Sequence, residues 1–433
     1  MRFRSEYDRR IIRLAIPALG ALAAEPLYVL VDTAVVGHLG RSQLAALGLA
    51  ATVLSVLAMF NFLQYGTTAQ VARATGAGEN LTAARLGAQC LWLSLAFGCL
   101  VALTVAVLAA PVVHAIGVEG QTATYAVTYL RIAALGVPSA FIAIGGQGFL
   151  RGVSDLRTPL VIVIAGNVVN VILEVVLVYG LDLGIEGSAW GTVVAQTGMG
   201  VAMAAAILRR VGLEQAGLRP ELARRLLSLG KFIFVRTAFL LASFALAGVV
   251  VARLGDAPLA AHQVAFQLWV LLALILDAVA IAGQIIVGQE LGATRPDAAF
   301  AASVRMIGLS VVVGTAFAFV FLGLGDVIPR IFTSDAEVLA QCALLWPLFA
   351  LMQPLNGAVF ALDGILIGAS DGLYLALSMA VAFVIFAGAL AVAAWADWGV
   401  RGVWGAFTVL IVARLALMGG RFLRRQWLVT GYE

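Results

Sequence analysis

Charged residues are scarce in this chain. Only 12% of its 433 residues are Asp, Glu, Lys or Arg, whereas 62% are hydrophobic. A soluble domain is about a quarter charged and about half apolar. A chain so poor in charge cannot cover its surface with polar groups, so lipid must cover much of it. The net charge of +4 needs no nucleic-acid partner, because basic residues in loops orient a membrane protein.

Cysteine and histidine are also rare, with three of each. Cys90, Cys99 and Cys342 lie in apolar runs without paired spacing or a neighbouring histidine cluster. The sequence therefore predicts neither a disulfide nor a metal site. The histidines and aspartates are dispersed and supply no reactive constellation, so we expect a protein that is not an enzyme and needs no cofactor. The sequence contains no P-loop, which argues against transport powered directly by ATP.

The chain is rich in long apolar runs. A bilayer core of about 30 Å requires roughly 20 apolar residues per helix, and twelve runs of that order recur. They predict an all-α integral membrane protein of about twelve transmembrane helices. The runs lie near residues 11–37, 44–72, 86–113, 122–149, 160–181, 187–208, 229–252, 259–288, 304–328, 337–366, 373–395 and 401–420.

The basic residues of the loops test this count. With the N-terminus placed inside the cell, 20 basic residues fall in inside segments and four in outside segments. A wrong number of helices would scramble this bias. We therefore expect a multi-pass protein of the bacterial inner membrane with both termini in the cytoplasm. The four outside residues are Arg41, Arg253, Arg330 and Arg401, and the three within helices are Arg131, Arg236 and Arg414.

The two halves of the chain resemble each other. Residues 35–50 match residues 250–265 at eight of sixteen positions, and GFLRGVSD at 148–155 matches GILIGASD at 364–371. The two offsets, 215 and 216, are nearly the same. We predict bundles of six helices at 1–208 and 229–433, joined by a cytoplasmic linker at 209–228. Because six is even, both repeats have one topology, and a pseudo-twofold axis should lie along the membrane normal.

Four motifs occur along the chain, namely DTAVVGHLG at Asp32–Gly40, RGVSD at Arg151–Asp155, Asn170 with Glu174, and GQELG at Gly288–Gly292. They resemble motifs of the multidrug and toxic compound extrusion (MATE) family, especially its DinF-like branch. The resemblance covers nearly the whole chain. It implies two six-helix bundles around a central cleft and export of drugs or metabolites coupled to H⁺ or Na⁺. Asp32, Asn170 and Glu174 match the positions that bind the coupling cation in the family, although members often carry Asp in place of Glu174.

Carboxylates within apolar helices support the same sites independently. A charge at a helix centre costs roughly 2.5–3.5 kcal/mol on insertion scales, so such residues are rare and usually functional. Glu25 and Asp32 lie seven apart on one helix face, and Asn170 and Glu174 extend a polar stripe that starts at Asn167. If these faces meet, they form a site that can take and release H⁺, which we favour, or hold Na⁺. A structural hydrogen-bonded cluster is the alternative.

Polar residues of the second half form a second set. Asp277 and Gln284 lie seven apart on one predicted helix, and Asn356 and Asp363 on another. The repeat register pairs Asn61 with Asp277 and Gln147 with Asp363. We predict that this set lines a substrate cleft and attracts cationic or amphipathic small molecules, although such residues can also cap or cross-link helices. The members are Asn61, Gln147, Asp277, Gln284, Asn356 and Asp363.

Several further residues are expected to have structural roles. Pro17, Pro138 and Pro354 lie inside predicted helices and should break or bend them. His262 is expected at the outer membrane surface, solvated or capping a helix. Arg236 is expected to extend its charge from a helix end towards water.

The sequence as a whole predicts a monomeric, cation-coupled antiporter that exports small organic molecules by alternating access, surrounded by membrane lipids. A flippase for lipid-linked precursors, from the same superfamily, is one alternative. It would need a strongly cationic cleft, and only three arginines lie within helices. An integral membrane enzyme that modifies lipids is the other alternative.

Overall fold

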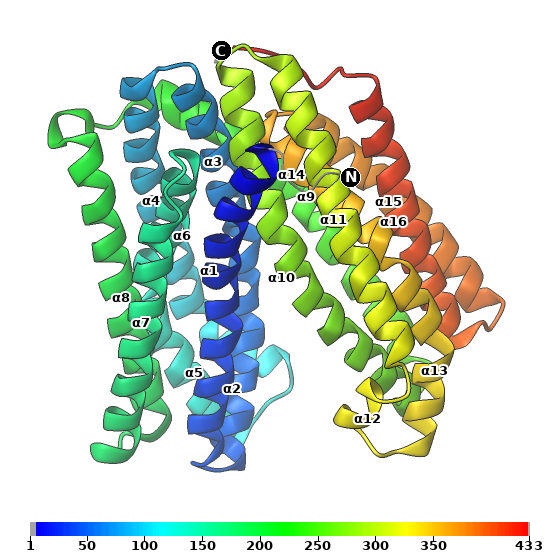
Figure 1. Cartoon of the computed structure of the whole chain (residues 1–433). Coiled ribbons are helices and arrows are strands. Elements are labelled where there is room, and N and C mark those ends of the chain that lie inside the picture. Colours follow the sequence, from blue (N-terminus) through cyan, green and yellow to red (C-terminus); the bar gives the residue numbers. More distant parts are fainter. Residues whose placement is uncertain (1–5, 432–433) are drawn as a thin grey trace. The chain divides into compact units, whose positions relative to one another are not determined.

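The computed structural model describes residues 6–431, and within them it contains helices and no strands. Figure 1 shows the helices in chain order. The first half contains α1 (Glu6–Gly37), α2 (Arg41–Leu54), η1 (Ser55–Asn61), α3 (Phe62–Gly76), α4 (Asn80–Ala115), α5 (Gly120–Ala134), α6 (Val137–Gly152), α7 (Arg157–Glu174), η2 (Val175–Gly180), α8 (Gly184–Val211) and η3 (Leu213–Gln215). The second half contains α9 (Pro220–Ala252), α10 (Asp256–Gly292), α11 (Pro296–Gly323), α12 (Ile328–Phe332), α13 (Ala336–Leu351), α14 (Gln353–Gly368), α15 (Gly372–Trp395) and α16 (Gly399–Leu423).

Ten helical segments of the described chain are long and apolar enough to cross a membrane. The number rises to twelve when each of two bent helix pairs counts as one span. The pairs are α5 with α6, bent by 53°, and α13 with α14, bent by 49°. They coincide with the predicted spans 122–149 and 337–366, so the expected multi-pass, all-α class is confirmed.

Proline explains both bends. Pro138 and Pro354 each stand in the first turn of the second helix of a pair. The proline ring cannot donate a backbone hydrogen bond and clashes with the preceding turn, so the incoming helix ends just before it. The breaks predicted at these prolines are confirmed. The helix α1, in contrast, runs through Pro17 without interruption.

The chain divides into two compact units, one of residues 20–230 and one of residues 6–19 with 231–431. The sequence did not predict that the start of α1 packs with the second half. Ion pairs explain this assignment, because Arg10 contacts Glu290 at 2.7 Å and Asp8 contacts Arg305 at 3.2 Å. A single helix, α1, is therefore shared by both units.

The internal repeat is visible in the backbone. Residues with positive φ recur in both halves at the offset of the sequence repeat, and two of the three pairs consist of residues other than glycine, in which a positive φ is rare. Gly40 (φ 138°) corresponds to Gly255 (φ 109°), and Ser154 (φ 63°) corresponds to Ser370 (φ 60°). Asp182 and Asp397 form a third pair, at φ 53° and 52°. Matching turns at matching positions show that each half follows the same path.

Glycines allow close contacts between helices in each unit. Gly148 and Gly152 of α6 lie against the backbone of α3, where a Cβ on Gly148 would stand 2.5 Å from the carbonyl oxygen of Gln64. Their counterparts Gly364 and Gly368 lie against α10 in the same way. Small residues four apart allow membrane helices to approach this closely. The offset of 216 therefore repeats packing as well as turns.

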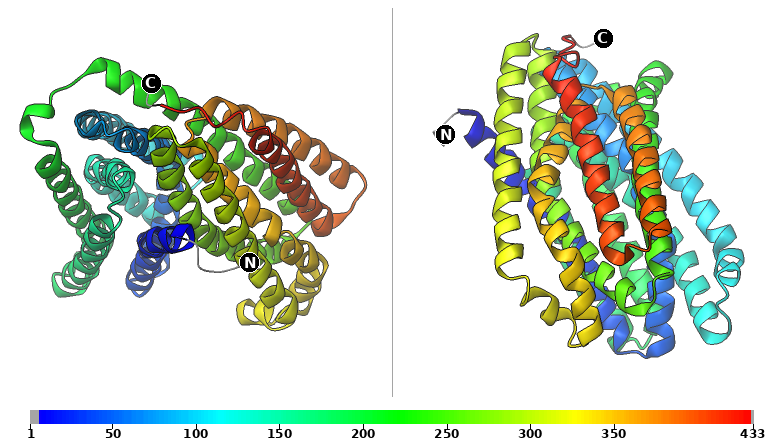
Figure 2. Two further views of the ribbon diagram at one scale, coloured as in Figure 1. Left: turned by 45° about the horizontal axis from the view of Figure 1, so that its top comes forward. Right: turned by 90° about the vertical axis from the view of Figure 1, so that its right-hand side faces the viewer.

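Aromatic side chains fill the interior of the 231–431 unit around α10 and α16. Trp404 is fully buried, and its ring centroid lies 5.4 Å from that of Phe407. His262 belongs to this cluster, since its ring stacks on Phe407 at 6.2 Å and it is only 6% exposed. The expectation that His262 is solvated or caps a helix is wrong, because α10 turns that face towards α16. Figure 2 shows α16 and the neighbouring α15, in red and orange, side by side.

The loop between α6 and α7 is anchored by Asp155. Its carboxylate accepts hydrogen bonds from the backbone N–H and the hydroxyl of Thr158, at 3.1 and 2.6 Å, and pairs with Arg210 of α8. Burial by itself raises the pKa of Asp155, but these partners outweigh it, so the pKa lies below its usual value. The second half contains a similar ion pair, because Asp371, the counterpart of Asp155, pairs with Arg421 at 2.8 Å.

We expect Asp155→Asn to lower the stability of the purified protein by about 1 kcal/mol at neutral pH, since the ion pair is partly exposed. A carboxylate with a lowered pKa contributes stability above its unfolded pKa and loses that contribution as the pH falls through its folded pKa. The difference between wild type and variant should therefore vanish in acid. Thermal unfolding from pH 7 to pH 3 measures it, with Asp182→Asn as control. A difference that does not become smaller as the pH falls below about 4 would contradict the assignment.

Candidate functional site

Three helices of the 20–230 unit each contribute two polar side chains four residues apart. Residues at this spacing share one helix face. The pairs lie on α1, α7 and α8, within spans that are mostly apolar. They are Tyr28 with Asp32, Asn170 with Glu174, and Ser188 with Thr192.

Ser188 links the two carboxyl groups of the cluster. Its hydroxyl lies 2.7 Å from Oδ1 of Asp32 and 3.4 Å from Oε1 of Glu174. Asp32 is 6% exposed, and Glu174 and Ser188 are fully buried. A serine hydroxyl has one proton to donate, so it cannot fully satisfy two ionised carboxylates. The pair would repel strongly here if both were charged, which makes a bound proton or cation favourable.

Thr192 connects the remaining members. Its Oγ1 lies 2.8 Å from the hydroxyl of Tyr28 and accepts a hydrogen bond from Nδ2 of Asn170 at 3.4 Å. Tyr129 of α5 lies beside Asp32 and Thr192 and is 4% exposed. These contacts hold α1, α7 and α8 around the carboxyl pair and fix the orientation of the amide.

Two buried oxygen atoms of the cluster have no hydrogen-bond partner among the described residues. They are Oδ1 of Asn170 and Oε2 of Glu174. Buried polar atoms are usually paired, so both are available to a ligand. Oxygen donors suit protons and hard cations. No group of three or more His, Cys, Asp or Glu side chains able to hold a metal ion occurs in residues 6–431.

The backbone changes at Glu174. It is the last residue of α7, and the same span continues as the π-helix η2. Short π-helical segments within α-helices often mark functional sites. On the facing helix, Gly191 lies beside this residue, and a Cβ there would stand 3.4 Å from Cγ of Glu174, at van der Waals contact.

The structure brings together three of the four residues predicted to couple a cation, namely Asp32, Asn170 and Glu174. The fourth, Glu25, is exposed and takes no part in the hydrogen bonds of this cluster. Asn167, from the same predicted stripe, donates a hydrogen bond to the carbonyl oxygen of Ala24 at 2.9 Å. Its amide therefore joins α7 to α1. A coupling role for Glu25 stays a prediction.

Tyr28, Ser188 and Thr192 were not predicted from the sequence. Their spacing gave a usable signal, because each follows or precedes a polar partner by four residues within an apolar span. Single hydroxyl groups are common in membrane helices, however, and only the packing of α8 against α7 shows which of them reach the carboxylates.

A second buried cluster lies in the 231–431 unit. Asp363 of α14 forms an ion pair with Arg236 of α9, and its Oδ1 lies 3.6 Å from Nη2 of Arg414 of α16. The three side chains are between 5% and 14% exposed. The expectation that Arg236 extends into water is wrong, because α9 packs it towards a carboxylate that it can neutralise.

These contacts bear on the predicted substrate residues of the second half. With two guanidinium groups beside it, Asp363 presents no net negative charge to a cation. Asn356 is buried and donates to Oε1 of Gln353 at 3.1 Å, while Gln284 is buried with Oε1 unpaired. Asp277 is half-buried on α10. Their place in a substrate cleft stays a prediction.

The two predicted substrate residues of the first half lie in the other unit. Asn61 is half-buried at the end of η1, and Gln147 of α6 accepts a hydrogen bond from Arg151 at 3.2 Å. Their part in a cleft also stays a prediction.

Comparisons with known proteins agree with the repeat and with the fold. A model of the MatE family matches residues 17–176 and again residues 233–392, at the offset of 216. Protein DETOXIFICATION 44, chloroplastic, of Arabidopsis thaliana is 32% identical over 94% of this chain and 80% of its own length. DNA damage-inducible protein F of Escherichia coli is 32% identical over 99% of this chain and 94% of its own length. The Vibrio cholerae MATE transporter VcmN in its bent form has a TM-score of 0.89 at 19% identity, covering 97% of this chain and 98% of its own.

Proposed function

Because this chain belongs to the multidrug and toxic compound extrusion (MATE) family of membrane transporters, we propose that it is an antiporter that exports small organic molecules in exchange for H⁺. Members of this family are transporters and not enzymes, so the alternative of a lipid-modifying enzyme is set aside. The resemblance to the DinF-like branch agrees with the Escherichia coli relative, which aligns along almost the whole chain.

The shared hydroxyl contact of Asp32 and Glu174 carries the coupling proposal. Two carboxyl groups meet one serine in a fully buried site, and Oε2 of Glu174 has no partner. One added proton would remove one of the two charges and supply the missing hydrogen bond. The same proton would leave again when the site opens to water of lower acidity. Na⁺ would require more oxygen ligands in fixed geometry, so we favour H⁺.

The path of α1 suggests how binding of a proton at this carboxyl pair affects the rest of the protein. Asp32 lies on the part of α1 that belongs to the 20–230 unit, whereas the start of the helix belongs to the other unit. Neutralising Asp32 removes its desolvation cost and allows α1 to repack against α7 and α8. Exchange follows if the protonated and unprotonated sites prefer different conformations. Entry of the ion and exit of the substrate then become one cycle.

The remaining features of the proposal follow from the family and the loop charges. We propose substrates that are amphipathic or cationic, a monomeric protein in a bacterial inner membrane, and both termini in the cytoplasm. Asp32, Asn170 and Glu174 bind the coupling ion. The flippase alternative gains no support, since Arg236 and Arg414 are both engaged with Asp363.

Export from proteoliposomes tests this function. Ethidium, an amphipathic cation, serves as the probe, and its movement is followed under an imposed proton gradient and separately under a sodium gradient. We expect transport that responds to the proton gradient and collapses when a protonophore is added. Transport driven only by sodium would reject H⁺ coupling, and transport that ignores both gradients would reject the antiporter.

A further inference from the structure

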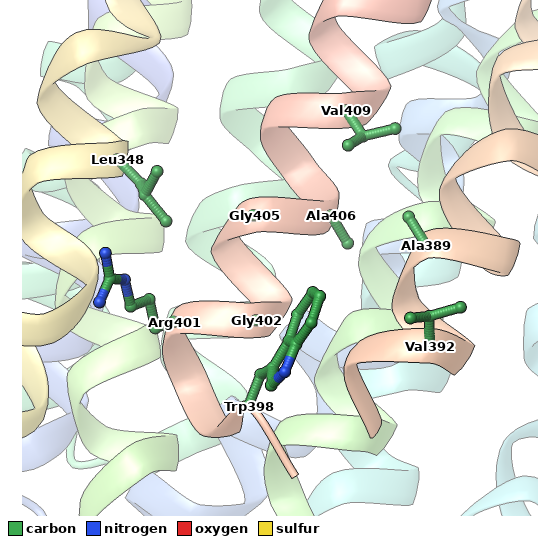
Figure 3. A pocket seen from close by; sticks show the side chains of 9 residues that line it. All are labelled: Leu348, Ala389, Val392, Trp398, Arg401, Gly402, Gly405, Ala406 and Val409. Carbon is green, nitrogen blue, oxygen red and sulfur yellow. The ribbon is translucent and has the colours of Figure 1, made fainter. Parts of the chain in front are cut away.

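A groove runs along α16 between α13 and α15 (Figure 3). Gly402, Gly405, Ala406 and Val409 form its floor, at the 3–4 residue spacing of one helix face. Leu348 of α13 forms one wall, and Ala389 and Val392 of α15 form the other. The cavity measures about 710 Å³, within the range of ligand-binding sites.

Small residues create this groove. A Cβ placed on Gly405 would have no heavy atom within 4 Å, so bare backbone forms the floor at that point. Ala389 and Ala406 add only a methyl group each. Since α13 and α15 both pack on α16, the missing side chains leave an apolar channel between two walls.

One end of the groove lies at a membrane surface. The helix α15 ends at Trp395 and α16 begins at Gly399. Trp395 is 87% exposed and Trp398 is 61% exposed. Exposed tryptophans of membrane helices collect at the boundary between lipid and water. The groove therefore begins at head-group level beside Trp398 and extends along α16 into the apolar layer.

Arg401 gives this entrance a positive charge. It lines the groove in the first turn of α16 and is exposed (Figure 3). It forms no ion pair with any residue between 6 and 431. Asp397 lies in the adjacent turn but does not pair with it. An apolar groove that opens beside a free guanidinium complements an amphiphile with a negatively charged head.

We propose that this groove binds one acyl chain of an anionic phospholipid whose phosphate pairs with Arg401. The occupant is a lipid and not a water-soluble ligand, because the walls are apolar and Val392 and Val409 are 51% and 38% exposed. The site is therefore continuous with the surface that the bilayer covers. Lipids with net charge are preferred to zwitterionic ones, since only the former leave the phosphate charge uncompensated.

Native mass spectrometry of the purified full chain in detergent tests the proposal. Phosphatidylglycerol and phosphatidylcholine with identical acyl chains are titrated, and the bound lipids are counted. Wild type should bind one phosphatidylglycerol more tightly than phosphatidylcholine. Arg401→Gln should lower the phosphatidylglycerol affinity about fivefold and abolish the preference, because one basic group near the surface is worth about 1 kcal/mol. Gly405→Leu should lower both affinities at least about tenfold by occupying the channel.

Matched control variants distinguish the loss of this lipid site from general effects of a substitution on lipid binding. Gly420→Leu adds the same side chain to α16 at another position without neighbours within 4 Å, and Arg253→Gln removes another exposed arginine. Both should bind lipid as wild type does. Inorganic phosphate alone should not compete, because it has no chain for the groove. Wild-type binding by Gly405→Leu, or an unchanged preference in Arg401→Gln, would overturn the proposal, whether or not the transporter is coupled to protons.

Discussion

Replacing Asp32 with asparagine should abolish export against a gradient while leaving the protein folded. Asparagine has the shape of a protonated aspartate and can still accept the hydrogen bond from Ser188, which lies 2.7 Å from Oδ1. It cannot bind and release a proton, so the site is held in one charge state and the cycle stops. We expect ethidium export in proteoliposomes under a proton gradient to fall from the wild-type rate to that of protein-free vesicles.

Two comparisons make this result specific. Asp182→Asn makes the same chemical change at an exposed residue of the same unit and should export at the wild-type rate. Binding of ethidium to purified Asp32→Asn, measured by fluorescence, should be retained, which separates loss of coupling from loss of the substrate site. Export by Asp32→Asn at the wild-type rate would remove this residue from the mechanism and leave Glu174 as the coupling carboxylate.

Replacing Asp363 with asparagine should destabilise the protein severely. The change leaves Arg236 and Arg414 buried without their shared counter-ion. Removing one member of a buried ion pair typically costs about 3–5 kcal/mol, because the remaining charge is uncompensated. We expect a lower thermal unfolding temperature in detergent and a smaller yield of folded protein from membranes.

The surface pair of Asp297 and Arg425 provides the control. Asp297 is 96% exposed on its side chain and lies 3.9 Å from the guanidinium, so Asp297→Asn should leave the unfolding temperature unchanged. Replacing Asp363 and both arginines together by apolar residues of similar size should recover much of the loss, since the replacement removes all three charges of this cluster. An Asp363→Asn protein as stable as wild type would show that the carboxylate is free for a substrate.

The site in the first half was more predictable than the cluster in the second. Asp32, Asn170 and Glu174 stand out because each is a polar residue in an apolar span. Placing a polar side chain there costs free energy, so a functional role is expected. Asp363 stands out in the same way, but its partners do not. Arg236 and Arg414 lie 127 and 51 residues from it along the chain, and nothing in the sequence selects them from the other arginines.

Glu25 and His262 are two further residues whose contacts could not be predicted from the sequence. Glu25 shares the periodicity of Asp32, yet it takes no part in the cluster at Ser188. His262 lies near the start of a long apolar helix, and the sequence suggests exposure, but the structure buries it against Phe407. Periodicity assigns residues to one face of a helix, and does not say which other helix that face meets.

The membrane class, the repeat and the bends at Pro138 and Pro354 could be predicted from the sequence alone. Hydropathy depends only on the local run of residues, and proline acts on the turn beside it. The folded structure was needed to show that Ser188 reaches both carboxylates, that Asp363 contacts two arginines, and that α16 carries an open groove at Gly405. Each of these depends on contacts between helices far apart in the chain, where side-chain size and helix approach fix the partners of a polar group.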